Sequence, residues 1–211
     1  MNDNFVLIDN IYRSRMNLLD ILEERGYNVN KYRNFSPAEA TAAIAAFPSL
    51  SFKVSKDETN ICDVRYANIT RQKLDKFFDD IDDEHSENTE VIVMMIVPIS
   101  DAHHMIALKQ YVKLKESGEK RKLRVSFFSV DMMVVNPMKH FLVPKHEILP
   151  KEQHKELMDS MYITSMSQFP EIKFHIDPIA RCIGAVPGDI VKITRPSPSS
   201  GESIMYRACA P

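Results

Sequence analysis

The chain has 211 residues, of which 44% are hydrophobic and 27% are charged, and its formal net charge is −2. These proportions are typical of a globular protein with one or two domains. Without a surplus of lysine and arginine, the net charge gives no electrostatic basis for strong independent binding to nucleic acid, and only a local basic patch stays open. No apolar run approaches the roughly 18 residues that a membrane helix needs, and the first residues lack the pattern of a secretory signal. We therefore expect no membrane partner.

Two helices are expected in the first fifty residues. Apolar residues recur at three- and four-residue steps from Ile8 to Arg25, and Gly26 ends this pattern. The segment Ser36–Glu39 combines a capping serine, a proline at the first helical position and a glutamate three residues after the serine. It predicts the start of an alanine-rich helix that runs to about Phe47.

From residue 50 to about residue 135, the pattern is that of strands alternating with helices. Strands are expected over Leu50–Ser55, Ile61–Ala67, Glu90–Val97 and Leu123–Phe128, with a continuation at Met132–Val135, and helices over Thr70–Ile81 and Ser100–Glu116. The uncharged run Val91–Val97 is typical of a strand that is buried on both faces. This order predicts an α/β fold, a mixed sheet with helices on its faces. Asn136-Pro137 is the expected end of this first part.

The remaining residues predict a small α+β domain. Its expected elements are an extended segment over Phe141–Leu149, a helix over Lys151–Asp159, a helix after Asp177, and strands over Asp189–Arg195 and Ile204–Cys209. Asp177 is suited to cap the second helix because its carboxylate accepts free N–H groups of the first turn. Pro178 suits the first helical position, and Gly184 suits the left-handed end.

Three linked motifs in this second part resemble those of a known family. They are Val143–His146, Asp177–Arg181 and Gly188–Ser197, followed by the pair Tyr206-Arg207. In order and spacing they resemble the assembly domain of the fifth subunit shared by the eukaryotic nuclear RNA polymerases, a family that also has archaeal members. The segment from Arg13 to Tyr27 is similar to the opening helix of the same family.

The resemblance implies a non-catalytic polymerase subunit with two domains, residues 1–138 and residues 139–211. The first would be a jaw with a fold like that of restriction endonucleases, placed near downstream duplex DNA. The second would be an assembly domain that docks on the largest polymerase subunit, among other subunits. No cofactor and no small molecule are implied. The polymerase would place the chain in the nucleus of a eukaryotic cell, or in the virion or viral factory if a large DNA virus encodes it.

Two sets of site residues follow from the resemblance. The DNA-proximal set is the helix start Ser100, Asp101, Ala102 and His103, where free backbone N–H groups can face a phosphate. Asp101 departs from the family's pattern and adds a negative charge at that point. The subunit-interface set is Pro144, His146, Asp177, Pro178, Arg181 and Arg195.

Two other functions stay open at this point, a nucleic-acid enzyme with a nuclease-like fold and a free protein-interaction module. The nuclease would need an aspartate, which Asp63 supplies, and an acidic-x-Lys pair in the next buried strand, which Val91–Val97 lacks. The seven histidines show no ligand spacing, and His103 and His104 are adjacent in one helix. Cys62, Cys182 and Cys209 form no CxxC pair. We therefore expect no catalytic and no metal-binding residues.

Overall fold

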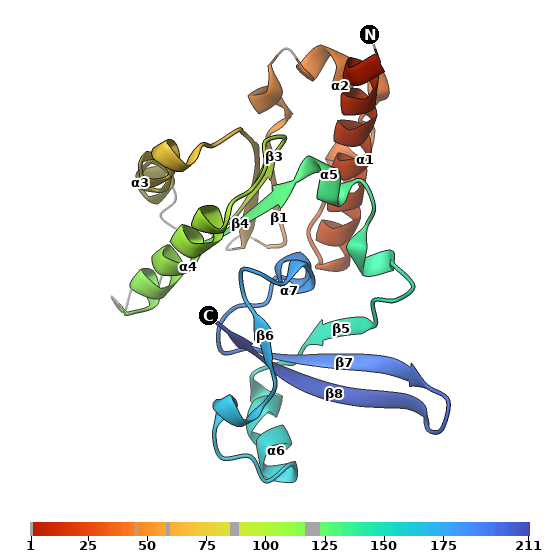
Figure 1. Cartoon of the computed structure of the whole chain (residues 1–211), viewed down its shortest axis with the longest axis vertical. Coiled ribbons are helices and arrows are strands. Elements are labelled where there is room, and N and C mark those ends of the chain that lie inside the picture. Colours follow the sequence, from red (N-terminus) through yellow and green to blue (C-terminus); the bar gives the residue numbers. More distant parts are fainter. Residues whose placement is uncertain (1, 45, 58–59, 85–88, 117–122) are drawn as a thin grey trace. The chain divides into compact units, whose positions relative to one another are not determined.

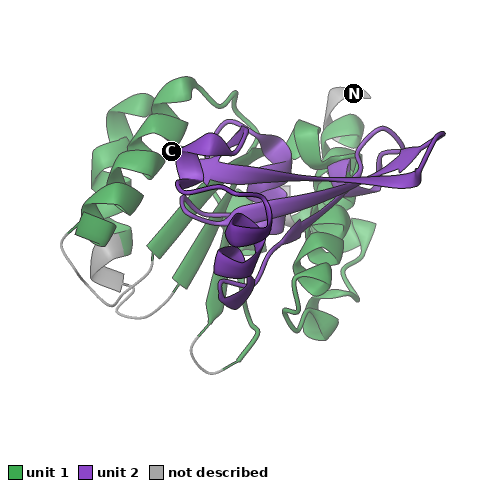
Figure 2. Cartoon of the chain, turned by 90° about the horizontal axis from the view of Figure 1, so that it is seen from below, with its two compact units in different colours: residues 1–136 green, residues 137–211 purple. Residues whose placement is uncertain are grey.

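A computed structural model describes residues 2–44, 46–57, 60–84, 89–116 and 123–211. The chain forms two compact units, Met1–Asn136 and Pro137–Pro211, which Figure 2 colours green and purple. The division lies two residues before the end of the expected first domain at residue 138. Each unit has its own four-stranded sheet.

Unit 1 is built on a mixed sheet with the strand order β1-β2-β3-β4. Its strands are β1 (Phe52–Ser55), β2 (Ile61–Tyr66), β3 (Thr89–Met95) and β4 (Leu123–Ser129). β1 runs antiparallel to β2, whereas β2, β3 and β4 are parallel. The helices are α1 (Asn2–Glu24), α2 (Pro37–Ile44), α3 (Leu74–Glu84), α4 (Asp101–Glu116) and α5 (Val130–Met133), with the short 3-10 turns η1 (Asn30–Tyr32), η2 (Phe47–Leu50) and η3 (Arg71–Lys73). The mixed sheet with helices confirms the α/β prediction.

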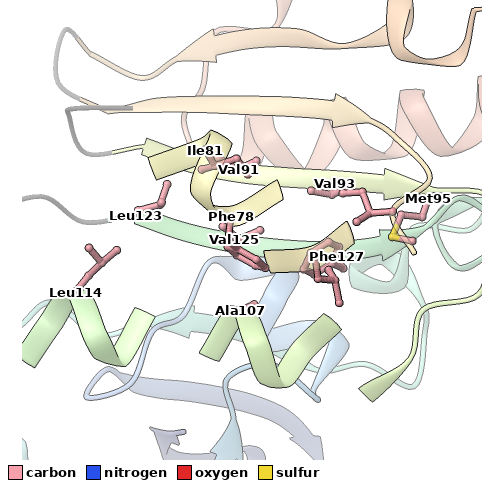
Figure 3. Close-up of a cluster of buried hydrophobic side chains, with 12 residues drawn as sticks. Phe78, Ile81, Val91, Val93, Met95, Ala107, Leu114, Leu123, Val125 and Phe127 are labelled. Atoms are coloured by element: carbon pink, nitrogen blue, oxygen red, sulfur yellow. The ribbon is translucent and has the colours of Figure 1, made fainter. Parts of the chain in front are cut away.

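Helices cover both faces of this sheet. α3 and α4 connect the parallel strands and lie on one side, and α1 lies on the other (Figure 1). On the α3/α4 side, alternate residues of β3 and β4 meet apolar residues of the two helices (Figure 3). The buried members of this cluster are Ile69, Leu74, Phe78, Ile81, Val91, Val93, Met95, Ala107, Leu114, Leu123, Val125 and Phe127. All seven residues of β3 are buried, as expected for a strand that is covered on both faces.

Local sequence signals set two of the helix ends. At α2, the backbone N–H of Glu39 donates to Ser36 Oγ at 3.2 Å and that of Ser36 donates to Glu39 Oε2 at 2.7 Å, which confirms the predicted capping box. After α1, Gly26 adopts a φ of +89°, and the N–H of Tyr27 donates to the Leu22 carbonyl at 3.0 Å. This is the left-handed ending that Gly26 predicts.

The predicted strand continuation over Met132–Val135 is wrong, because α5 occupies Val130–Met133. Asn17 of α1 explains the difference: its Nδ2 donates to the Met133 carbonyl at 2.9 Å and to the Val134 carbonyl at 2.8 Å. These bonds satisfy carbonyl groups at the end of the short helix. Val130 and Met133 are buried, so the helix also contributes to the core.

Unit 2 is built on a second mixed sheet with the strand order β5-β7-β8-β6. Its elements are η4 (Pro137–Lys139), β5 (Lys145–Ile148), α6 (Glu152–Ser160), η5 (Met166–Gln168), β6 (Glu171–Lys173), α7 (Pro178–Ile183), β7 (Ile190–Ser197) and β8 (Gly201–Ala210). β7 and β8 form a long antiparallel hairpin (Figure 1). The expected small α+β domain is confirmed in its elements, although β6, which pairs in parallel with β8, was not predicted.

Candidate functional site

One face of the sheet in unit 2 carries a groove. Directly paired residues of neighbouring strands share a face, so His146 of β5, Ile193 of β7 and Met205 of β8 lie on one side. By alternation, Arg195, Arg207 and Ile172 lie on that same side. The groove has a volume of about 300 Å³ and is lined by Leu142, Val143, Pro144, His146, Ile172, Asp177, Ile179, Ile193, Arg195 and Arg207.

The start of α7 forms one wall of the groove. Asp177 Oδ1 accepts hydrogen bonds from the backbone N–H of Ile179 at 2.8 Å and of Ala180 at 3.1 Å. Pro178 occupies the first helical position, and Gly184 ends the helix with a φ of +83°. The predicted cap, start and end of this helix are thus confirmed, and they fix the side chains of Asp177 and Ile179 at the groove.

The groove contains more positive than negative charge. The guanidinium of Arg195 is exposed, and Arg207 Nη1 donates to the backbone carbonyl of Glu171 at 2.8 Å. His146 Nδ1 lies 2.7 Å from the Pro144 carbonyl, which can only accept, so Nδ1 carries the proton and Nε2 remains available. Asp177 supplies the one carboxylate among the lining residues, and that carboxylate is used to cap α7.

The start of α4 has a different arrangement. Ser100 and Asp101 are exposed at the helix start, and Ala102 is half-buried. His103 is only 3% exposed. Its Nδ1 accepts the backbone N–H of Ser100 at 3.2 Å, so its Nε2 carries the proton and donates to the Ile69 carbonyl at 2.9 Å. His103 thus takes the place that Glu39 has in the capping box of α2.

The carboxylates of β2 and β3 lie on opposite faces of the sheet in unit 1. Asp63 pairs with Val91, whereas Glu90 pairs with Cys62. Since paired residues share a face and neighbours alternate, Asp63 lies on the α3/α4 side and Glu90 on the α1 side. Asp63 is bound by Arg65, whose Nε lies 3.0 Å from its Oδ2. These two carboxylates are separated by the sheet and therefore cannot bind one shared metal ion.

Glu90 belongs to a buried ion-pair cluster that the sequence did not predict. Its carboxylate accepts two hydrogen bonds from Arg25, at the end of α1, and lies 3.7 Å from Arg124 Nη1. Burial by itself raises the pKa of Glu90, but the charges of Arg25 and Arg124 outweigh it and hold that pKa below its usual value. Burial, together with the negative charge of Glu90, raises the pKa of Tyr27 to about 12.

Neither metal ligands nor membrane helices are found in the described parts of the chain. Within residues 2–44, 46–57, 60–84, 89–116 and 123–211, no group of three or more histidine, cysteine, aspartate or glutamate side chains is placed to hold a metal ion. Among the helices in those ranges, none combines the length and the apolar character needed to cross a bilayer.

Comparison with known proteins assigns the chain to a family. The model of the RNA polymerase Rpb5 C-terminal domain matches residues 135–209. DNA-directed RNA polymerase subunit Rpo5 of Archaeoglobus fulgidus is 57% identical over 68 residues, which cover 32% of this chain and 87% of the archaeal protein. The chain belongs to the Rpb5/Rpo5 family.

Two further relatives show how far the similarity extends. A Dictyostelium discoideum protein, subunit rpabc1 of DNA-directed RNA polymerases I, II, and III, is 29% identical over 206 residues, covering 96% of this chain and 98% of that protein. Rpo5 of Sulfolobus acidocaldarius is 53% identical over 68 residues, covering 32% of this chain and 79% of the archaeal protein. The family resemblance is thus confirmed, and the Dictyostelium match includes both units.

The structure gathers most of the interface residues that the Rpb5 resemblance implies. Pro144, His146, Asp177 and Arg195 all line the groove, although they come from three separate segments. Pro178 lies next to them at the start of α7. Sequence reasoning missed Arg207 and the apolar residues Ile179 and Ile193 as members of this site. The signal that locates Arg207 is its register opposite Val191, which needs the strand pairing.

Two residues of the implied sets differ from expectation. Arg181 was expected to reach a partner, but it is only 7% exposed, and its neighbours Ala180 and Cys182 in α7 are buried as well. His103 was expected to face DNA, but it is buried and hydrogen bonded at both ring nitrogens. Both ring nitrogens are therefore already used within the chain, and no ring N–H is left to donate to a phosphate.

Proposed function

We propose that this chain is a non-catalytic subunit of a multisubunit DNA-directed RNA polymerase, and that unit 2 docks it on the largest subunit. The observation that carries the proposal is the match to archaeal Rpo5. In Archaeoglobus fulgidus, the 68 matched residues make up 87% of a protein named as a polymerase subunit. A chain hardly longer than unit 2 therefore has a place in that polymerase.

The groove in unit 2 supports this proposal physically. It combines an apolar floor with arginine side chains, a composition that is typical of energetically important parts of protein interfaces. Its flank carries two large exposed apolar residues, Phe141 at 87% and Leu142 at 71% exposure. In our proposal Pro144, His146, Asp177, Pro178 and Arg195 form the docking face, and Arg181 supports it from within.

In the same proposal, unit 1 is a jaw beside downstream duplex DNA. Ser100, Asp101 and Ala102 at the start of α4 are the residues that would face the DNA. The helix start offers backbone N–H groups, but the carboxylate of Asp101 repels a phosphate. We therefore propose that DNA approaches this helix only when the polymerase holds both in place. The chain would reside where its polymerase resides, which is the nucleus in a eukaryotic cell.

Co-purification from the native source tests this function. The full chain is expressed with an affinity tag and purified after treatment with a DNA-degrading enzyme, so that DNA cannot bridge unrelated proteins. We expect the largest polymerase subunit to be recovered in equal molar amount, with the tag alone as the control. Recovery of the chain without polymerase subunits would overturn the proposal.

A further inference from the structure

The charges of the groove in unit 2 are not balanced within the chain. Its lining residues include Arg195, Arg207 and Asp177, which leaves a formal charge of +1 with His146 neutral. The carboxylate of the neighbouring Glu171 is paired with Lys173 at 3.2 Å. Among the described residues, no carboxylate lies within ion-pair distance of Arg195 or Arg207. The guanidinium of Arg195, and the N–H groups of Arg207 other than the one that bonds to the Glu171 carbonyl, are therefore available to a negative group from outside.

The positions of the groove residues along β7 define the spacing of charge and apolar surface that a ligand of the groove must have. Arg207 lies level with Val191, and Ile193 lies midway between Val191 and Arg195 on the same face. A rise of about 3.3 Å per residue puts Ile193 about 6.6 Å from Arg195 along the strand. Ile193 thus forms an apolar floor in the groove. The guanidinium of Arg195 lies about 6.6 Å beyond it along the strand, and that of Arg207 lies at the other end.

We propose that this groove receives an acidic–apolar segment of another polymerase subunit. An apolar side chain of that segment lies over Ile193, and an aspartate or glutamate beside it pairs with Arg195. A carboxylate can accept two parallel hydrogen bonds from a guanidinium, which gives this contact its specificity. The inference rests on the proposed function, and it adds the chemistry of the partner segment.

A protein segment fits the groove better than a nucleic-acid backbone does. A phosphate would also pair with an arginine, but a phosphate backbone has no side chain for the floor at Ile193. The neighbouring Leu142, 71% exposed, and Phe141, 87% exposed, likewise add apolar surface to the rim. The net charge of the whole chain, −2, offers no general attraction to DNA.

Charge reversal at Arg195 is the first arm of the test. The full chain carrying Arg195→Glu is compared with wild type and with Lys192→Glu, which makes the same change on the opposite face of β7. We expect Arg195→Glu to weaken binding to the purified remainder of the polymerase at least about tenfold, as measured for close charge pairs at interfaces. The loss should shrink at high salt. Lys192→Glu should bind as wild type does.

A zero-length cross-link is the second arm and identifies the group that faces Arg195. In an Arg195→Lys variant, a carbodiimide joins the lysine amine to a carboxylate that touches it, and the reagent takes up the released water as a urea. We expect a new cross-linked peptide that joins position 195 to an aspartate or glutamate of another subunit, flanked by an apolar residue. Wild-type protein should lack this peptide.

The outcomes separate this inference from the proposed function. If wild type fails to bind polymerase subunits, the proposed function fails and this inference falls with it. If wild type and Arg195→Glu bind equally and no cross-link forms at position 195, only this inference is overturned. Loss of bound nucleic acid in Arg195→Glu, with the subunits retained, would assign the groove to a phosphate and overturn the inference as well.

Discussion

Removing Arg25 should lower the free energy of unfolding of unit 1, because the buried carboxylate of Glu90 loses its main ion-pair partner. Arg25 donates two hydrogen bonds to Glu90, including one from Nη1 to Oε1 at 3.1 Å, and the two side chains are only 16% and 8% exposed. An Arg25→Met substitution keeps most of the side-chain volume but leaves the Glu90 carboxylate with a single nearby positive charge, that of Arg124, whose Nη1 is 3.7 Å away, and with the side-chain hydrogen bond of Tyr27. The variant therefore buries a poorly compensated charge.

The expected loss is large compared with that of an exposed ion pair. Breaking a buried pair by removing one partner costs about 3–5 kcal/mol. The control is Arg13→Met on the same helix, where Arg13 Nε lies 2.9 Å from Asp9 Oδ2 and both side chains are well exposed. An exposed pair of this spacing contributes about 0.3–0.5 kcal/mol. Adding Glu90→Gln to Arg25→Met should recover part of the loss, because the unpaired carboxylate is removed.

Urea unfolding followed by circular dichroism measures these differences. The pKa of Glu90 is held below its usual value of 4.5, so the pair stabilises the fold above that value and its contribution is lost as the pH falls through the lowered pKa. The gap between wild type and Arg25→Met should therefore be largest near neutral pH and should narrow in acid. If Arg25→Met unfolds within about 1 kcal/mol of Arg13→Met, our account of this cluster is wrong.

Three further predictions concern both units. Asp177→Ala should lower the free energy of unfolding of unit 2 by about 1 kcal/mol, or about 4–8 °C in its thermal midpoint, whereas Asp177→Asn should keep most of the cap; equal midpoints for Ala and wild type would contradict this. Burial raises the pKa of Tyr27 and of Tyr66 to about 12 from 10.0, so stability should be complete below pH 10 and fall as the pH rises toward 12; a flat midpoint over that range would be the contrary result. The free protein should bind duplex DNA weakly and should not cut it with Mg²⁺, and cleavage that disappears in Asp63→Ala would refute our interpretation of the two separated carboxylates.

Elements that depend on neighbouring residues in the chain could be predicted from the sequence. The capping box at Ser36 and Glu39 and the cap, start and end of α7 need only a few adjacent residues, and the structure has them as predicted. β3 was also predictable, because an uncharged run of this length has few alternatives.

Features that depend on packing could not be predicted. α5 replaces a strand because Asn17, more than a hundred residues earlier, bonds to the carbonyl groups at its end. His103 and Arg181 are polar residues within helices, so the sequence alone favours exposed side chains at both positions. Both are nevertheless buried, and His103 bonds to the carbonyl of a residue more than thirty positions away. The spacing of apolar residues along the chain does not reveal contacts between such distant positions.

The candidate site likewise has some residues that the sequence motifs supply and others that only the folded structure adds. The motifs of the family resemblance supplied Pro144, His146, Asp177 and Arg195, which the fold brings to one groove. Arg207 enters the groove only through the register of β7 and β8. The chemistry of the groove, two guanidinium groups on either side of an apolar floor, therefore emerges from strand pairing and not from any single motif.

The central claim is that docking on the polymerase resides in unit 2. The most direct test expresses residues 1–136 and residues 137–211 separately, each with the same tag, and measures how much of the largest polymerase subunit each one recovers beside the full chain. We predict that residues 137–211 recover that subunit nearly as well as the full chain and that residues 1–136 recover almost none. Recovery by residues 1–136, with none by residues 137–211, would contradict the claim.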